Sequence, residues 1–128
     1  MKRWLKSQHD DVAYEHANAA LRESLPELEE AVVRAYEYAE PEPPGPHTLY
    51  DEALNPYINK LLDASLETDE TLERVFAFIE RLSSSTDKNI QDVVIATILP
   101  NLIGEPRLAL ARRYMGPATR RLLRKAQQ

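Results

Sequence analysis

Cysteine is absent from this 128-residue chain, and glycine occurs only three times. Without cysteine there can be no disulfide, no thiolate metal site and no cysteine nucleophile. Three scattered glycines are too few for a Gly-rich phosphate loop, which excludes the dinucleotide-binding and P-loop motifs. The remaining function classes are those that need neither thiol chemistry nor such a loop.

Long hydrophobic runs are absent as well. No apolar stretch approaches the roughly 20 residues of a membrane span, and the first ten residues, MKRWLKSQHD, lack the apolar core of a signal peptide. Hydrophobic residues still make up 43% of the chain, which is enough to form one core. We expect a cytoplasmic protein with a flexible N-terminal tail over 1–9 and a single helical domain over 10–128.

The apolar residues recur at helical spacing almost throughout, and no segment alternates like a strand. This pattern predicts an all-α fold of about six short helices in antiparallel pairs, either a HEAT-like array or a compact helical bundle. Helix starts are expected near residues 11, 25, 48, 69, 87 and 106, with a last helix over 117–126. The segment 40–47, EPEPPGPH, is expected to be a Pro-rich loop, because proline lacks the N–H that a helix needs.

Several residues carry signals for helix ends. Ser24 followed by Glu27 forms a capping-box pattern for the second helix, and Thr48 is the expected N-cap of the third. Pro56 is expected to kink or interrupt that third helix. The fifth helix is expected to begin at about Asp87.

Five segments occur in the order LPELEE, LNPYINKLL, VFAFIERL, NIQDVVIATILPNLIG and ARRYMGPATRRLL. Together they resemble a small, largely uncharacterised bacterial family of all-helical domains that includes immunity-type proteins. The resemblance spans roughly residues 17–125, and its marks are a Phe-Ile-Glu stretch and a Tyr-x-Gly-Pro turn. Leu99-Pro100 stands where such sequences carry a glutamate-leucine pair. The resemblance implies a helical fold and a role in protein binding, and it brings no catalytic motif.

Charge is strongly divided along the chain. From 23 to 80 there are 15 acidic and 3 basic residues, whereas 106–128 contains 7 basic residues and no acidic one. An acidic surface repels nucleic acid and attracts basic partners in a salt-dependent way. The basic end has only Tyr114 as an aromatic residue and no nucleic-acid motif, so nucleic-acid binding is not expected. Arginines in such a segment more often pair with acidic residues or lie at helix C-termini than bind nucleic acid, and we expect the same here.

We expect a partner-binding surface in the acidic half, where tyrosines flank the Pro-rich loop. Tyrosine combines apolar area with a hydroxyl and is enriched at binding hot spots. The candidate residues are Glu37, Tyr38, Glu40, Glu42, Tyr50, Asp51, Glu52, Asp63, Asp69 and Glu70. The alternatives are a solvated acidic surface without a partner and tyrosines that only pack around the loop.

Other candidate sites are weaker. His9 and His16 lie seven residues apart and could share a helix face, but the HExxH and ExxH metal motifs are absent. Glu80 follows Phe78-Ile79 and is either a catalytic acid or an edge-of-core acid hydrogen-bonded to a neighbouring helix. We expect no catalytic residue, no cofactor and no metal.

The function that fits these patterns best is a non-enzymatic protein-binding domain. The most specific version of this hypothesis is an immunity protein that binds and occludes a cognate cationic toxin, such as a basic nuclease. The alternatives are a helical adaptor or scaffold of unknown partner, and a small enzyme or metal-binding protein. The sequence leaves the oligomeric state open.

Overall fold

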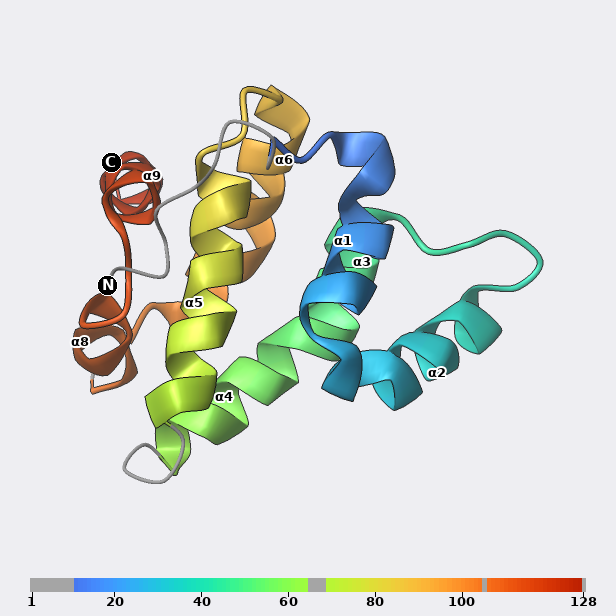
Figure 1. The fold of residues 1–128 in the computed structure, drawn as a ribbon, viewed down its shortest axis with the longest axis horizontal. Helices are drawn as coiled ribbons and strands as arrows, with labels where there is room; N and C mark the ends of the chain where they lie inside the picture. The colour runs from blue at the N-terminus through green and yellow to red at the C-terminus, as the bar shows by residue number, and fades with distance from the viewer. Residues whose placement is uncertain (1–10, 65–68, 105, 128) are drawn as a thin grey trace.

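The computed structural model describes residues 11–64, 69–104 and 106–127. Those residues form helices and loops without a strand, which confirms the predicted all-α class (Figure 1). Their helical elements are η1 (Tyr14–His16), α1 (Ala17–Ser24), η2 (Pro26–Leu28), α2 (Glu29–Ala39), α3 (Pro46–Leu49), η3 (Tyr50–Leu54), α4 (Asn55–Asp63), α5 (Asp69–Ser83), α6 (Lys88–Val93), η5 (Val94–Ile98), α7 (Leu99–Leu102), α8 (Arg107–Arg112) and α9 (Pro117–Ala126). Elements that follow one another without a break merge, so the described residues form seven continuous helices, as many as the six expected starts and the expected last helix together. The expected tail, 1–9, lies outside the described residues.

The core is built around α5, which packs against α4, α6 and α9 (Figure 1). Its apolar residues at helical spacing, Leu72, Val75, Phe76, Ile79 and Leu82, are all fully buried. The C-terminal α9 packs against both α5 and η5, so the end of the chain returns to its middle. In a HEAT-type array each repeat contacts only its sequence neighbours. Of the two expected architectures, the compact bundle therefore describes this fold.

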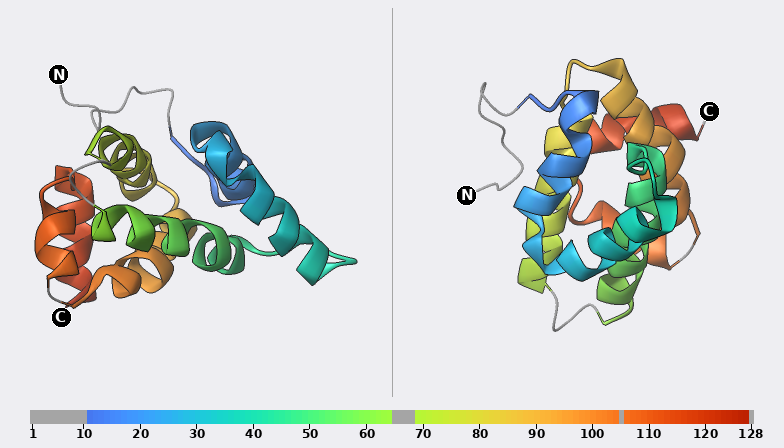
Figure 2. Two further views of the ribbon diagram at one scale, coloured as in Figure 1. Left: turned by 90° about the horizontal axis from the view of Figure 1, so that it is seen from below. Right: turned by 90° about the vertical axis from the view of Figure 1, so that its right-hand side faces the viewer.

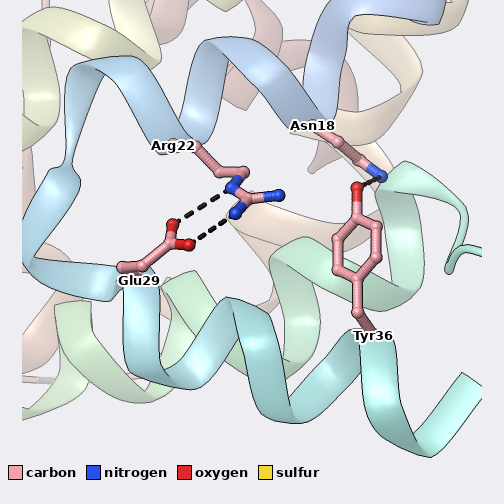
Figure 3. A network of polar contacts seen from close by, with 4 residues as sticks. All are labelled: Asn18, Arg22, Glu29 and Tyr36. Atoms are coloured by element: carbon pink, nitrogen blue, oxygen red, sulfur yellow. Dashed lines mark hydrogen bonds and ion pairs between the residues drawn. The ribbon is translucent and has the colours of Figure 1, made fainter.

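The helix formed by η1 and α1 and the helix formed by η2 and α2 are an antiparallel pair that projects from the remaining helices (Figure 2). Arg22 on α1 donates two hydrogen bonds to the Glu29 carboxylate on α2, and the Asn18 amide donates to the Tyr36 hydroxyl at 3.2 Å (Figure 3). The Arg22 guanidinium also lies over the Tyr36 ring, 5.5 Å from its centroid. These contacts fix the direction of α2 relative to α1, although exposed ion pairs contribute little to stability.

Two expected helix caps are wrong, and one helix start is confirmed. Leu25, not Ser24, occupies the cap position before η2, and the Ser24 hydroxyl instead accepts a hydrogen bond from Arg81 on α5. The third helix begins at Pro46 after Gly45, two residues before Thr48, because proline fits the first turn of a helix. Asp87 caps α6 by accepting the Asn89 backbone N–H at 2.9 Å.

Pro56 and Pro100 do not interrupt their helices, so of the two outcomes expected for Pro56, a kink or an interruption, the interruption does not occur. Each follows a five-residue π-helical segment, η3 before Pro56 and η5 before Pro100. Proline cannot donate to the carbonyl four residues back, and its ring clashes with that group. The wider π turn accommodates the ring and lets the helix continue. Such turns are frequent at functional sites, and here η3 and η5 pack against each other.

Glu27 ties η2 to two helices of the core. Its carboxylate accepts hydrogen bonds from the Tyr57 hydroxyl at 2.6 Å and from the Arg74 guanidinium at 2.6 and 3.1 Å. Burial alone would raise the pKa of Glu27, but the hydrogen bonds from Arg74 and Tyr57 outweigh burial and lower that pKa below its ordinary value of 4.5. Burial and the bond to Glu27 raise the pKa of Tyr57 to about 12.

This network predicts an acid-sensitive contribution to stability. Because the pKa of Glu27 is lower in the folded state, its contribution is complete above the ordinary value of 4.5 and is lost as the pH falls through the folded value. Glu27→Gln is expected to lower the free energy of unfolding by about 1 kcal/mol at neutral pH and by less in acid. Urea unfolding from about pH 7 to pH 3 measures both effects. Glu70→Gln, at an exposed position of α5, is the control, and equal losses in acid for wild type and Glu27→Gln would contradict the assignment.

Candidate functional site

The end of α2 and the loop after it carry four of the predicted partner residues, Glu37, Tyr38, Glu40 and Glu42, which we call the acidic tip. All four are exposed, and Tyr38 is the most exposed large hydrophobic residue of the described chain at 93%. No ion pair joins the three tip glutamates to another described residue. The tip therefore presents uncompensated negative charge around a solvent-exposed aromatic ring.

The acidic tip is held in place by α1. The Asn18 amide donates to the Pro44 carbonyl at 3.0 Å as well as to Tyr36, so it anchors the Pro-rich loop as well as α2. The prolines of the loop fix their own φ angles. A surface that is ordered before binding loses less entropy when a partner docks.

Asp51 and Glu52 of η3 are exposed, and η3 packs against α2. Glu52 and Tyr38 line a hollow of about 270 Å³ together with Ala31, Arg34 and Ala35. Arg34 is also 3.7 Å from Glu30, an exposed pair one helical turn back. Of the two predicted acids of η3, Glu52 therefore lies next to Tyr38 of the acidic tip.

Tyr50 was expected on the partner surface, and that expectation is wrong. Its side chain is fully buried, and its hydroxyl donates to the Ala17 carbonyl at 2.7 Å. The ring stacks on Phe78 with centroids 6.2 Å apart, and burial raises the pKa of the hydroxyl strongly. Tyr50 lies three and four residues before the buried Ala53 and Leu54, so it shares the inward face of this helix.

Asp63, Asp69 and Glu70 form a separate group at the other end of the third helix (Figure 1). Asp63 lies about 18 Å from Asp51 along that helix, at 1.5 Å per residue. Asp63 pairs with Arg107 at 3.4 Å, and Asp69 accepts a hydrogen bond from the Tyr114 hydroxyl. The eight predicted acids thus do not form one continuous surface, and two of the three distant ones already have partners within the chain.

Glu80 plays a structural part, in agreement with the edge-of-core interpretation. It is 2% exposed, and its carboxylate accepts the backbone N–H groups of Ala118 and Thr119, both at 2.9 Å, and the Thr119 hydroxyl at 2.8 Å. A carboxylate is well suited to the N-terminus of α9, where N–H groups have no partner in the helix. Gly116, just before α9, leaves room for this carboxylate.

The basic end of the chain follows the expected pairing in two cases. Arg107 pairs with Asp63, and Arg120 donates to the carbonyls of Met115 at 3.2 Å and Arg112 at 2.6 Å, closing the C-terminal end of α8. The other basic residues there are exposed: Arg112, Arg113, Arg121, Arg124 and Lys125. The positive charge lies on α8 and α9, away from the acidic tip (Figure 1).

The described residues provide neither a metal-binding cluster nor a membrane-spanning helix. Across 11–64, 69–104 and 106–127, no group of three histidine or acidic side chains is placed to hold a metal ion. His16 is exposed in η1, and His9, the other half of the candidate pair, lies outside the described residues. Among the helices of the same ranges, none is long and apolar enough to cross a membrane.

A sequence match places this architecture in a family. Residues 18–128 match the family described as a domain of unknown function, DUF7674. The chain belongs to the DUF7674 family. No curated protein and no solved structure matches the chain. The DUF7674 region contains the acidic tip, the Glu80 network and both π-helical segments, and the description of the family names no activity.

Within the DUF7674 region, sequence reasoning missed a polar cleft between the third and fifth helices. The cleft has a volume of about 560 Å³, and it is lined by His47, Thr48, Asp51, Glu52, Asn55, Ala96, Thr97, Pro100 and Asn101. The His47 ring lies between Thr97 and Asp92, with Nδ1 2.6 Å from the Thr97 hydroxyl and Nε2 3.6 Å from the Asp92 carboxylate. His47 is the last residue of the expected Pro-rich loop, but in the structure it lies in α3. The sequence contains one signal that could have indicated this cleft. Pro56 and Pro100 each lie inside a helical pattern, and a proline at such a position predicts an irregular helical turn.

Proposed function

We propose that this protein is a non-enzymatic protein-binding domain whose acidic tip docks on a basic protein. The observation that carries the proposal is Tyr38, 93% exposed and flanked by Glu37, Glu40 and Glu42 on an ordered projection. Tyrosine is enriched among the residues that contribute most to binding, because its ring supplies apolar contact area and its hydroxyl can form a hydrogen bond.

The charge of this region favours a cationic partner. Between 26 and 52 eight residues are acidic and Arg34 is the only lysine or arginine. Such a field speeds the encounter with a positively charged protein and weakens as salt is added. A charge-complementary partner whose active site is itself basic would be covered by the acidic tip.

The finer form of the proposal is an immunity protein that occludes a basic nuclease toxin in the cytoplasm. The resemblance of the chain to a family that includes immunity-type proteins supports this form. Nucleases carry basic surfaces because they bind phosphates. Under this proposal, inhibition is steric, and the chain needs no catalytic residue.

Capture of the partner from the native host tests the proposal. The tagged protein is incubated with cell extract at about 50 mM and about 300 mM salt, between which surface charges become strongly screened, and retained proteins are identified by mass spectrometry. We expect one basic protein, retained better at low salt. The triple variant Glu37→Lys/Glu40→Lys/Glu42→Lys and the single variant Tyr38→Ala are each expected to weaken its binding by at least about tenfold.

The matched control carries the same charge change at exposed positions outside the tip, Glu15→Lys/Glu23→Lys/Glu70→Lys. We expect it to retain the partner at moderate salt, since only the long-range field changes. Equal loss with both triple variants would mean that net charge, not the tip, governs binding. A captured partner without a basic surface would favour an adaptor, and a partner indifferent to Tyr38→Ala and to the tip reversal would overturn the proposal.

A further inference from the structure

The polar cleft beside η3 and η5 has features that the acidic tip does not explain. Its walls are fixed by bonds between helices that are distant in sequence, since the amides of Asn59 and Asn101 donate to each other at 3.1 and 2.9 Å. At about 560 Å³ the cleft falls within the range of small-molecule sites. It is therefore an open, preformed cleft with polar walls.

Asn55 is the buried polar residue of this cleft, at 3% exposure. Its Nδ2 donates to the Thr97 carbonyl at 3.0 Å and to the Asp51 carboxylate at 3.1 Å. Both partners accept hydrogen bonds, which settles the amide orientation and leaves Oδ1 as an acceptor. Oδ1 has no hydrogen-bond partner in the structure. A buried acceptor without a donor is destabilising, so a ligand that supplies an N–H or O–H group would gain from it.

Charge decides which kind of donor suits the cleft. Asp51 and Glu52 lie at its exposed edge, and none of its lining residues is lysine or arginine. The remaining lining groups are mostly hydroxyls, amides and the His47 ring. Two carboxylates beside an unpartnered acceptor favour a group that is both positively charged and rich in N–H donors.

We propose that this cleft binds a guanidinium or ammonium group, with Asp51 and Glu52 attracting the charge and Asn55 Oδ1 accepting an N–H. The group can come from a small organic amine or from an arginine or lysine side chain of a basic protein, because the chemistry is the same. The proposal does not depend on the acidic tip, since Glu37, Glu40 and Glu42 are not among the residues that line the cleft.

Titrations followed by ¹H–¹⁵N NMR test the proposal with three probes. Agmatine supplies a free guanidinium and ammonium, N-acetyl-arginine amide supplies a blocked arginine side chain, and N-acetyl-citrulline amide is its neutral counterpart. We expect saturable shifts at the Asn55 side-chain amide, Thr97 and Asn101 with agmatine, and none with the citrulline compound. Binding of both charged probes assigns the site to a side chain or an amine, and binding of agmatine alone assigns it to a free amine. The proposal would be overturned if neither agmatine nor N-acetyl-arginine amide saturates the site at about 10 mM, or if the citrulline compound binds as well as they do.

Two variants and one control identify the residues responsible. Asp51→Asn/Glu52→Gln removes two charges at exposed positions and is expected to weaken binding by at least about tenfold. Asn55→Ala removes the buried acceptor and is expected to do the same, with circular dichroism to verify folding. If Asn55→Ala does not fold, the exposed double variant still decides the question.

Glu40→Gln/Glu42→Gln, which removes the same charge from the acidic tip, is expected to change binding by less than about twofold. An equal loss in this control would mean that the cations bind by general attraction, which would contradict the cleft. Because tip variants leave the cleft unchanged, failure of partner capture and failure of cation binding can be told apart.

Discussion

Alanine at position 116 is expected to lower the free energy of unfolding by about 3 kcal/mol. The added Cβ would lie 2.5 Å from the Glu80 carboxyl carbon and 2.6 Å from Oε1, closer than side-chain atoms approach. The Glu80 side chain can move away only by giving up its hydrogen bonds to Ala118 and Thr119 at the start of α9. The backbone at position 116, with φ −82° and ψ 177°, suits any residue, so the whole effect comes from space.

Gly45→Ala is the matched control, because no atom lies within 4 Å of a Cβ built there. Gly45 precedes α3 with a negative φ, so its replacement is expected to change stability by less than about 1 kcal/mol. Urea and thermal unfolding of the two variants give the comparison. Equal stability of the two variants would show that α9 does not depend on the carboxylate as the structure indicates.

Glu80→Gln is expected to cost about 3 kcal/mol as well, for an electrostatic reason. The carboxylate uses both oxygens as acceptors, Oε2 for Ala118 and Oε1 for Thr119. A glutamine would turn its NH₂ group toward at least one of these N–H donors. The NH₂ group and the N–H that faces it would then both lack an acceptor in a buried site. Glu70→Gln on the same helix is exposed and is expected to have little effect.

The double variant Glu80→Gln/Gly116→Ala tests whether the two substitutions disrupt the same hydrogen-bond network or destabilise the protein independently. Since both substitutions break the same bonds at α9, the combined loss is expected to be smaller than the sum of the single losses by at least about 1 kcal/mol. Chemical denaturation of the four proteins in this cycle measures the difference. Simple additivity would mean that Gly116 and Glu80 act separately.

Local sequence patterns predicted the parts of the fold that depend on helical spacing. The apolar stripe of α5, the extent of α9 over 117–126 and the start of α6 after Asp87 are confirmed. In each case neighbours within one or two turns decide the outcome, because residues three and four apart share a face of the helix. The same local reasoning placed the tip residues Glu37, Tyr38, Glu40 and Glu42 at exposed positions.

Predictions failed where a choice depended on another part of the chain. Ser24 was a good capping residue by pattern, but its hydroxyl bonds to Arg81, 57 residues away. Tyr50 had the chemistry of an interface residue, but the core has a place for its ring beside Phe78 and an acceptor in Ala17. The hydroxyl groups of Ser24 and Tyr50 could each form a hydrogen bond with more than one partner, and the packing of the helices determines which partner is within reach.

Helical spacing and the order of charged residues along the chain were sufficient to predict the all-α class and the division between an acidic half and a basic C-terminal end. Which of these charges lie together depends on the packing of the helices, because residues far apart in sequence become neighbours only when the faces that carry them pack. The tertiary structure separated Asp63, Asp69 and Glu70 from the acidic tip and set Asn55 against the Thr97 carbonyl, 42 residues along the chain. Helical spacing fixes the face on which a side chain lies, whereas the neighbour it meets is fixed by burial of the whole apolar surface.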